Sequence, residues 1–94
     1  MAQKKLQRFA DLKTFTNVLE YPKEMQGKWS GFFKNTNPVI LELACGRGEY
    51  TVGMAGLFPQ QNCIGVDVKG KRMYIGAKKC LEEKITNAAF LRTQ

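Results

Sequence analysis

From residue 39 onward, short apolar runs alternate with longer segments of helical character. Apolar runs with the length of buried strands cover 39–43, 62–68 and 88–93. Helices are predicted for 49–58, where Gly53 and Gly56 should lie close to the sheet, and for 71–84, whose apolar residues recur at helical spacing. The order β-α-β-α-β with short turns predicts a parallel α/β sheet with right-handed crossovers and both helices on the same face.

The first 38 residues lack this pattern and form a predicted N-terminal extension (1–38), mostly helical, which the polar segment 34–38 separates from the α/β unit (39–94). Residues 17–21 are expected to be extended, because Pro22 disfavours a helical conformation in the residue before it. Two helices are predicted from apolar residues at helical spacing. The first carries Leu6, Phe9 and Leu12, and the second, from Lys23, carries Met25, Trp29, Phe32 and Phe33.

The segment from Val39 to Gly48, Val-Ile-Leu-Glu-Leu-Ala-Cys-Gly-Arg-Gly, has the pattern of a buried strand that ends in a tight glycine turn. Gly46 and Gly48 allow positive φ angles and let a ligand approach the backbone, and Ala44 is the smallest substitute for a third glycine. Asp67 follows about twenty residues later, where a nucleotide-binding βαβ unit places the acid that accepts hydrogen bonds from ribose hydroxyls. The pattern predicts a nucleotide-type cofactor site, although any tight strand-to-helix connection can use the same residues.

Glu42 lies between Leu41 and Leu43 near the end of the first strand. Dinucleotide sites do not require an acid here, whereas a ligand with an amino group, such as the methionine part of S-adenosylmethionine, does. A charge-assisted hydrogen bond from that amino group would contribute roughly 1.5 to 3 kcal/mol. The alternative is that Glu42 faces solvent at the end of the strand.

The net charge of the chain gives a separate indication of what it binds. It has 15 basic and 8 acidic residues, a net charge of +7, as expected for a protein that binds RNA or another polyanion. Lys4, Lys5 and Arg8 would lie together on the polar side of the first helix and are candidate RNA contacts. A solvated helix surface explains these three residues equally well, and an ordinary basic surface is an alternative explanation of the net charge.

Composition excludes several kinds of chemistry. The absence of histidine rules out His-based acid–base catalysis and His-metal ligation within this chain. Cys45, Cys63 and Cys80 form no Cys-x-x-Cys pair, so neither a metal site nor a disulfide framework is indicated, and Cys45 is interpreted as a turn residue rather than a nucleophile. No apolar run approaches the roughly 18 residues of a membrane span, and the first residues lack a signal-peptide core. We therefore expect a reduced, cytoplasmic protein that does not bind membranes.

Five tracts of the sequence resemble the bacterial tRNA (guanine-N7)-methyltransferases. They are Phe9-Ala-Asp-Leu, Leu41-Glu-Leu-Ala-Cys-Gly-Arg-Gly-Glu, Phe58-Pro, Ile64-Gly-Val-Asp-Val-Lys-Gly-Lys-Arg and Asn87-Ala-Ala-Phe-Leu-Arg. The resemblance covers most of this chain but only about the front half of such an enzyme. It implies the first half of a Rossmann-like class I methyltransferase fold, with S-adenosylmethionine as cofactor and N7 of a guanine in the tRNA variable loop as methyl acceptor.

By position, the resemblance implies that Glu42 and Asp67 bind the cofactor, that Gln94 lies near its adenine, and that Ala44 replaces the usual glycine. The family's Pro-Asp-Pro catalytic motif belongs to a later segment, so no catalytic residue can be assigned in this chain. We therefore expect the 94-residue chain alone to be inactive and either unstable or associated with copies of itself, through the open edge at 39–43 or an uncovered sheet face.

Two other functions are compatible with the sequence. A nicotinamide-dependent oxidoreductase shares the strand, the glycine turn and the distal acid, although Glu42 and the Ala44-x-Gly46-x-Gly48 spacing favour a methyltransferase. A non-catalytic RNA-binding module would need only the net charge of +7. Methylation of guanine N7 suits a chain without histidine, because N7 already presents an in-plane lone pair to an incoming methyl group.

Overall fold

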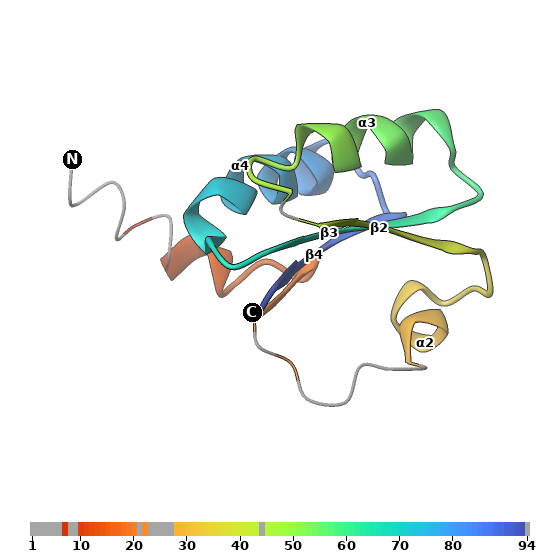
Figure 1. The fold of residues 1–94 in the computed structure, drawn as a ribbon, viewed down its shortest axis with the longest axis horizontal. Coiled ribbons are helices and arrows are strands. Elements are labelled where there is room, and N and C mark those ends of the chain that lie inside the picture. Colours follow the sequence, from red (N-terminus) through yellow and green to blue (C-terminus); the bar gives the residue numbers. More distant parts are fainter. Residues whose placement is uncertain (1–6, 8–9, 21, 23–27, 44, 94) are drawn as a thin grey trace.

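The computed structural model describes residues 7, 10–20, 22, 28–43 and 45–93, and the chain folds into a parallel sheet with helices on both faces (Figure 1). The strands lie in the order β1-β4-β3-β2, and each pairs with its neighbour in parallel. The element bounds are β1 Val18–Glu20, α2 Trp29–Phe33, β2 Val39–Leu43, α3 Glu49–Leu57, β3 Asn62–Asp67, α4 Gly70–Glu82 and β4 Ala88–Arg92. The three strands and two helices predicted from residue 39 onward are therefore confirmed to within one or two residues at each end.

The main core lies between the sheet and the helices α3 and α4, which cover the same face as predicted (Figure 1). Phe90 of β4 and Met73 of α4 are fully buried there, each with an exposed fraction of 0%. Leu12, from the N-terminal part of the chain, belongs to the same buried cluster. Burying a large side chain of this kind contributes about 1.5 to 3 kcal/mol, so these contacts fix both helices on the sheet.

The opposite face of the sheet is covered in part by α2 (Figure 1). Ile64 of β3 and Ala89 of β4 point to this face and are fully buried. On the neighbouring edge strand β2, Leu41 and Leu43 are 56% and 76% exposed. The cover therefore protects the centre of the sheet and leaves the β2 side of this face open.

The strand β1 is the element that the sequence pattern did not place in the sheet. Residues 17–21 were expected to be extended, but the predicted sheet had three strands and not four. Val18 to Glu20 pair with Phe90 to Arg92, and an ion pair of 2.6 Å between Glu20 Oε2 and Arg92 Nη1 joins the two strands. Three residues are too few for an alternating pattern, so long-range pairing decides this strand.

Of the two predicted N-terminal helices, the second is shorter than predicted, and the first is helical wherever it is described up to Leu12. Residues 7 and 10–12 are helical, whereas Lys28 is not and α2 spans only five residues. Trp29, Phe32 and Phe33 do lie together, with ring centroids 5.1 to 6.2 Å apart. The remaining members of the two predicted helical patterns, Leu6, Phe9 and Met25, lie outside the described residues.

Two glycines of α3 do not have the predicted role. Gly53 and Gly56 are exposed, and a Cβ atom built on either would meet nothing within 4 Å. The close approach occurs on α4 instead, where a Cβ on Gly76 would lie 2.8 Å from the carbonyl oxygen of Arg47. The expected contact with the sheet is therefore wrong, because α3 turns Thr51, Val52 and Ala55 inward rather than its glycines.

Candidate cofactor-binding site

The glycine loop connects β2 to α3 at the carboxyl end of the sheet. The Cys45 N–H donates to the Val66 carbonyl at 2.9 Å, which continues the pairing of β2 with β3 by one more residue. Gly46 and Gly48 have φ angles of 58° and 78°, so the predicted need for positive φ is confirmed at both glycines. The Val52 N–H donates to the Gly48 carbonyl, and α3 begins directly after the loop. The remaining loop residue, Ala44, lies outside the described residues.

Asp67 ends β3 beside this loop, and backbone N–H groups hold its carboxylate in place. Oδ2 accepts a hydrogen bond of 2.7 Å from Gly46, and Oδ1 accepts bonds of 2.7 and 3.1 Å from Val68 and Lys69. Burial raises the pKa of Asp67, but these backbone donors and the charge of Arg72 outweigh it and leave the pKa below its usual value. The group is therefore ionised at neutral pH, and Oδ2, which has one donor, keeps a lone pair for a further donor.

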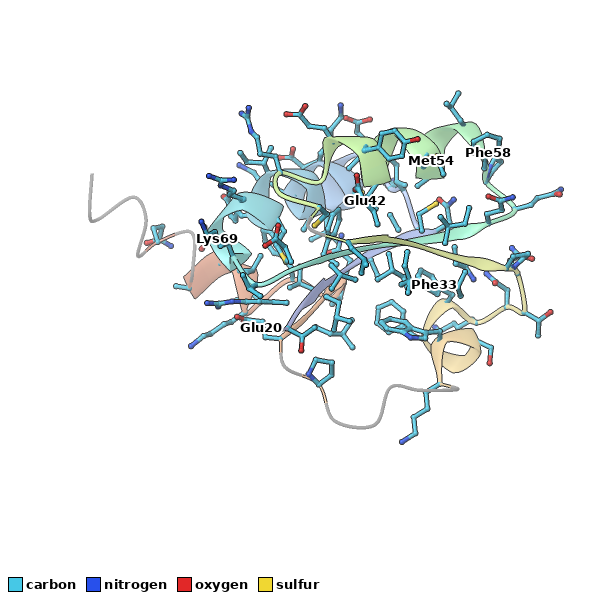
Figure 2. The ribbon with its side chains drawn as sticks, in the orientation of Figure 1. Glu20, Phe33, Glu42, Met54, Phe58 and Lys69 are labelled. Carbon is cyan, nitrogen blue, oxygen red and sulfur yellow. The ribbon has the colours of Figure 1, made fainter. Side chains whose placement is uncertain are left out.

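Glu42 points from β2 toward α3 and is half-buried rather than turned to solvent (Figure 2). The Thr51 hydroxyl, 1% exposed, donates to Glu42 Oε1 at 2.5 Å and so fixes the carboxylate against the first turn of α3. The interpretation of Glu42 as a solvent-facing residue is therefore wrong. Thr51 was not predicted as part of the site, and its position nine residues after Glu42 in a helix is a weak signal without the fold.

A small pocket of about 110 Å³ opens beside Glu42 between β2 and α3. Its walls are mostly apolar and are formed by Ile40, Leu41, Glu42, Tyr50, Thr51, Met54, Cys63 and Ile64. Drug-sized ligands occupy pockets of roughly 300 to 1,000 Å³, so this space can hold only a small group. A nucleoside would have to lie along the open carboxyl end of the strands, over Gly46, where a built Cβ meets nothing within 4 Å.

Cys45 lies in the loop between the two acids, and its thiol is not a nucleophile. Burial, followed by the charges of Asp67 and Glu42, raises the pKa of Cys45 to about 12. The thiol is therefore protonated at neutral pH, and only the thiolate is reactive. The part of the chain that the structure describes contains no cluster of three metal-ligating side chains and no helix long and apolar enough to cross a membrane.

Several predicted site residues cannot be placed. Gln94, the candidate adenine contact, and Lys4, Lys5 and Arg8, the candidate RNA contacts, all lie outside the described residues. The structure therefore brings together Gly46, Gly48 and Asp67, with Glu42 on the neighbouring strand, as the described part of the predicted site.

Comparison with known proteins places this arrangement in a family. A family model described as "Putative methyltransferase" matches residues 36–94, which include the whole glycine loop and both acids. The chain belongs to this methyltransferase family. The fold agrees, since the crystal structure of the antibiotic-resistance methyltransferase Kmr matches 61% of this chain and 31% of its own with a TM-score of 0.57 and 28% identity.

Curated relatives of this family member are longer proteins. The tRNA (guanine-N(7)-)-methyltransferase of Bacteroides fragilis is 50% identical over 99% of this chain, which covers 40% of that protein. The protein of the same description from Cytophaga hutchinsonii is 49% identical over 100% of this chain, which covers 44% of it. The chain thus spans less than half the length of these relatives.

Proposed function

We propose that this chain is the S-adenosylmethionine-binding part of a tRNA (guanine-N7)-methyltransferase. The observation that carries the proposal is the bond from the Gly46 N–H to Asp67 Oδ2, which fixes a charged acceptor beside a glycine loop. Glu42 lies on the adjacent strand with one oxygen held by Thr51. The matching family and the descriptions of the relatives support the methyl-transfer chemistry and the tRNA substrate.

The described residues fit the chemistry of this cofactor. Asp67 would accept a hydrogen bond from a ribose hydroxyl through Oδ2, which has one backbone donor, whereas Oδ1 already has two. Glu42 would accept from the amino group of the methionine part through the oxygen that does not bond Thr51. The open space over Gly46 allows a ligand to approach the backbone closely.

A sulfonium-bound methyl group is what the cofactor supplies when it is bound. The acceptor, guanine N7, has an in-plane lone pair and needs no general base, which agrees with the absence of histidine. This chain's own contribution is then to bind and orient the reactants, a source of large rate accelerations. Gln94 is proposed to contact the adenine, and Lys4, Lys5 and Arg8 to contact RNA phosphates, which position the RNA without reading its bases.

Titration calorimetry with S-adenosylhomocysteine tests the cofactor site. We expect Asp67→Ala and Glu42→Ala each to weaken binding by about tenfold or more, the effect of losing a charge-assisted hydrogen bond. Glu82→Ala is the matched control, because it removes an exposed acid at the far end of α4. Affinity equal to that of the unmodified chain in both site variants would refute the assignment. Tighter binding of NAD than of S-adenosylhomocysteine would favour the oxidoreductase alternative.

A further inference from the structure

A second hollow, of about 630 Å³, lies at the opposite end of the sheet from the glycine loop. Its walls come from the segment before β1, the end of α2, the end of α4 and the segment leading into β4. They are formed by Thr16, Asn17, Phe32, Phe33, Lys34, Cys80, Leu81, Lys84, Ile85, Thr86 and Ala88. Because all strands are parallel and rise about 3.3 Å per residue, this end is roughly 15 to 20 Å from Asp67.

One wall of the hollow is aromatic. The rings of Phe32 and Phe33 are half-buried and meet edge to face, with centroids 5.1 Å apart. Trp29 packs against both rings, so they are held by a neighbour that is not part of the wall. Figure 2 shows Phe33 on the side of the sheet away from α3. A fixed aromatic surface at the rim of a hollow suits a flat, unsaturated ligand.

The rim also carries two cations from separate parts of the chain. Lys34 follows α2 and Lys84 follows α4, and both are exposed. Neither ammonium group forms an ion pair with another described residue. Two unpaired cations beside an apolar hollow suit an anionic group on the same ligand.

A buried polar side chain completes the lining. Asn17 is 8% exposed, and its Nδ2 donates to the Ala77 carbonyl at 3.1 Å. Its Oδ1 is enclosed and has no hydrogen-bond partner among the described residues. Buried acceptors are normally satisfied, so a ligand with an N–H donor would satisfy this oxygen once the side chain turned toward the hollow.

We propose that this hollow binds one unpaired nucleotide of an RNA, in extension of the proposed function, on which the choice of RNA rests. The base would stack on Phe32 or Phe33 and offer an amino or imino group to Asn17, while Lys34 and Lys84 contact the flanking phosphates. Proteins that hold unpaired RNA combine these features, namely aromatic stacking, base-edge hydrogen bonds and backbone cations. The net charge of +7 agrees with a polyanionic ligand.

The test titrates the 94-residue chain with a single-stranded RNA hexamer and follows the emission of Trp29, the only tryptophan. Trp29 lies 5.7 Å from the ring of Phe32, so a base stacked there should change its fluorescence. We expect Phe33→Leu, which keeps an apolar side chain but removes the ring, to weaken binding by roughly fivefold or more. The double variant Lys34→Asn/Lys84→Asn should lower the dependence of log K on log salt by about 1.4. Asparagine tolerates the positive φ of both lysines.

Lys79→Asn is the matched control, since it removes an exposed charge from α4 outside the hollow. Equal hexamer affinity and salt dependence in the control and the lysine double variant would overturn the proposal, as would equal binding of a blunt RNA duplex. If circular dichroism shows that Phe33→Leu does not fold, the double variant Lys34→Asn/Lys84→Asn alone tests the proposal. Hexamer binding should be unchanged by Asp67→Ala, and S-adenosylhomocysteine binding by the hollow variants, so each proposal can fail without the other.

Discussion

Replacing Asp67 by asparagine separates the structural part of this carboxylate from its proposed ligand role. In the folded chain both oxygens accept backbone hydrogen bonds, one from Gly46 and the other from Val68 and Lys69. An asparagine has one acceptor oxygen, so it can face either Gly46 or the other pair. The amide nitrogen would then oppose an N–H donor on the remaining side.

The expected loss follows from this count. If the asparagine oxygen keeps the hydrogen bonds from Val68 and Lys69, the variant loses the charge-assisted bond from Gly46 and leaves the Gly46 N–H facing the amide nitrogen, which is itself a donor. Such bonds contribute roughly 1.5 to 3 kcal/mol when shielded, and Asp67 is only half-buried. Solvent competes at such a site, so we expect Asp67→Asn to lower the free energy of unfolding by about 1 to 2 kcal/mol.

The pH dependence of this loss has a defined sign. The folded pKa of Asp67 lies below its ordinary value of 3.8, so its stabilising contribution is fully present above that pH. The contribution is lost as the pH falls through the lower, folded pKa. The difference between the unmodified chain and Asp67→Asn should therefore be constant from about pH 5 to 8 and shrink below about pH 4.

Urea denaturation followed by circular dichroism at pH 7 and at pH 3.5 measures both quantities. Glu82→Gln is the control, because it removes an exposed acid outside the sheet. A midpoint at pH 7 equal to that of the unmodified chain would contradict the inferred role of the backbone bonds. A difference that grows as the pH falls would contradict the sign of the pKa shift.

Three further predictions concern the loop and the open edge. Gly48→Ala should lower the free energy of unfolding by roughly 2 to 5 kcal/mol, because its Cβ would lie 2.5 Å from the buried Phe90 ring. Gly46→Ala meets no atom within 4 Å, so in the same urea assay it should lower the free energy of unfolding by only about 1 to 2 kcal/mol, the cost of its positive φ. With its pKa near 12, Cys45 should react with iodoacetamide at pH 8 about a thousandfold more slowly in the folded chain than in urea, as peptide mass spectrometry would show. We also expect the chain to self-associate through β2, so that sedimentation should show a smaller species for Leu43→Lys, and an unchanged distribution would refute this.

The elements that could be predicted from the sequence are those with a strong local pattern. β3 is a run of six residues of which the first four are buried, and α4 repeats its apolar residues at helical spacing. β1 could not be recognised as a sheet strand, because its three half-buried residues depend on pairing with β4, more than seventy residues away. The predicted contact of the α3 glycines with the sheet was wrong for a similar reason, since the short sequence of α3 does not reveal which side of the helix faces the sheet.

The residues of the candidate site also fall into those that a local pattern predicts and those that only the packed structure shows. The positions of Gly46, Gly48 and Asp67 could be predicted because a tight strand-to-helix turn and the acid that follows it in a βαβ unit use particular residue types at a characteristic spacing. Thr51 could not, because its role depends on how α3 is oriented over Glu42. A threonine in the first turn of a helix is otherwise unremarkable, and only the packed structure shows that it fixes an acid on the preceding strand.

The pairing of β2 with β3 explains both the site and the exposed edge. Leu43 of β2 pairs with Val66 of β3. The glycine loop that follows β2 and Asp67 at the end of β3 therefore meet at the same end of the sheet. This is why a hydrogen bond can join Gly46 to Asp67 across 21 residues of sequence. The same order, β1-β4-β3-β2, leaves β2 paired on one side only among the described strands. Glu42 therefore lies on an edge strand. A further strand that paired with β2 would restrict the motion of β2 and so hold Glu42, one acid of the candidate site, more firmly in place.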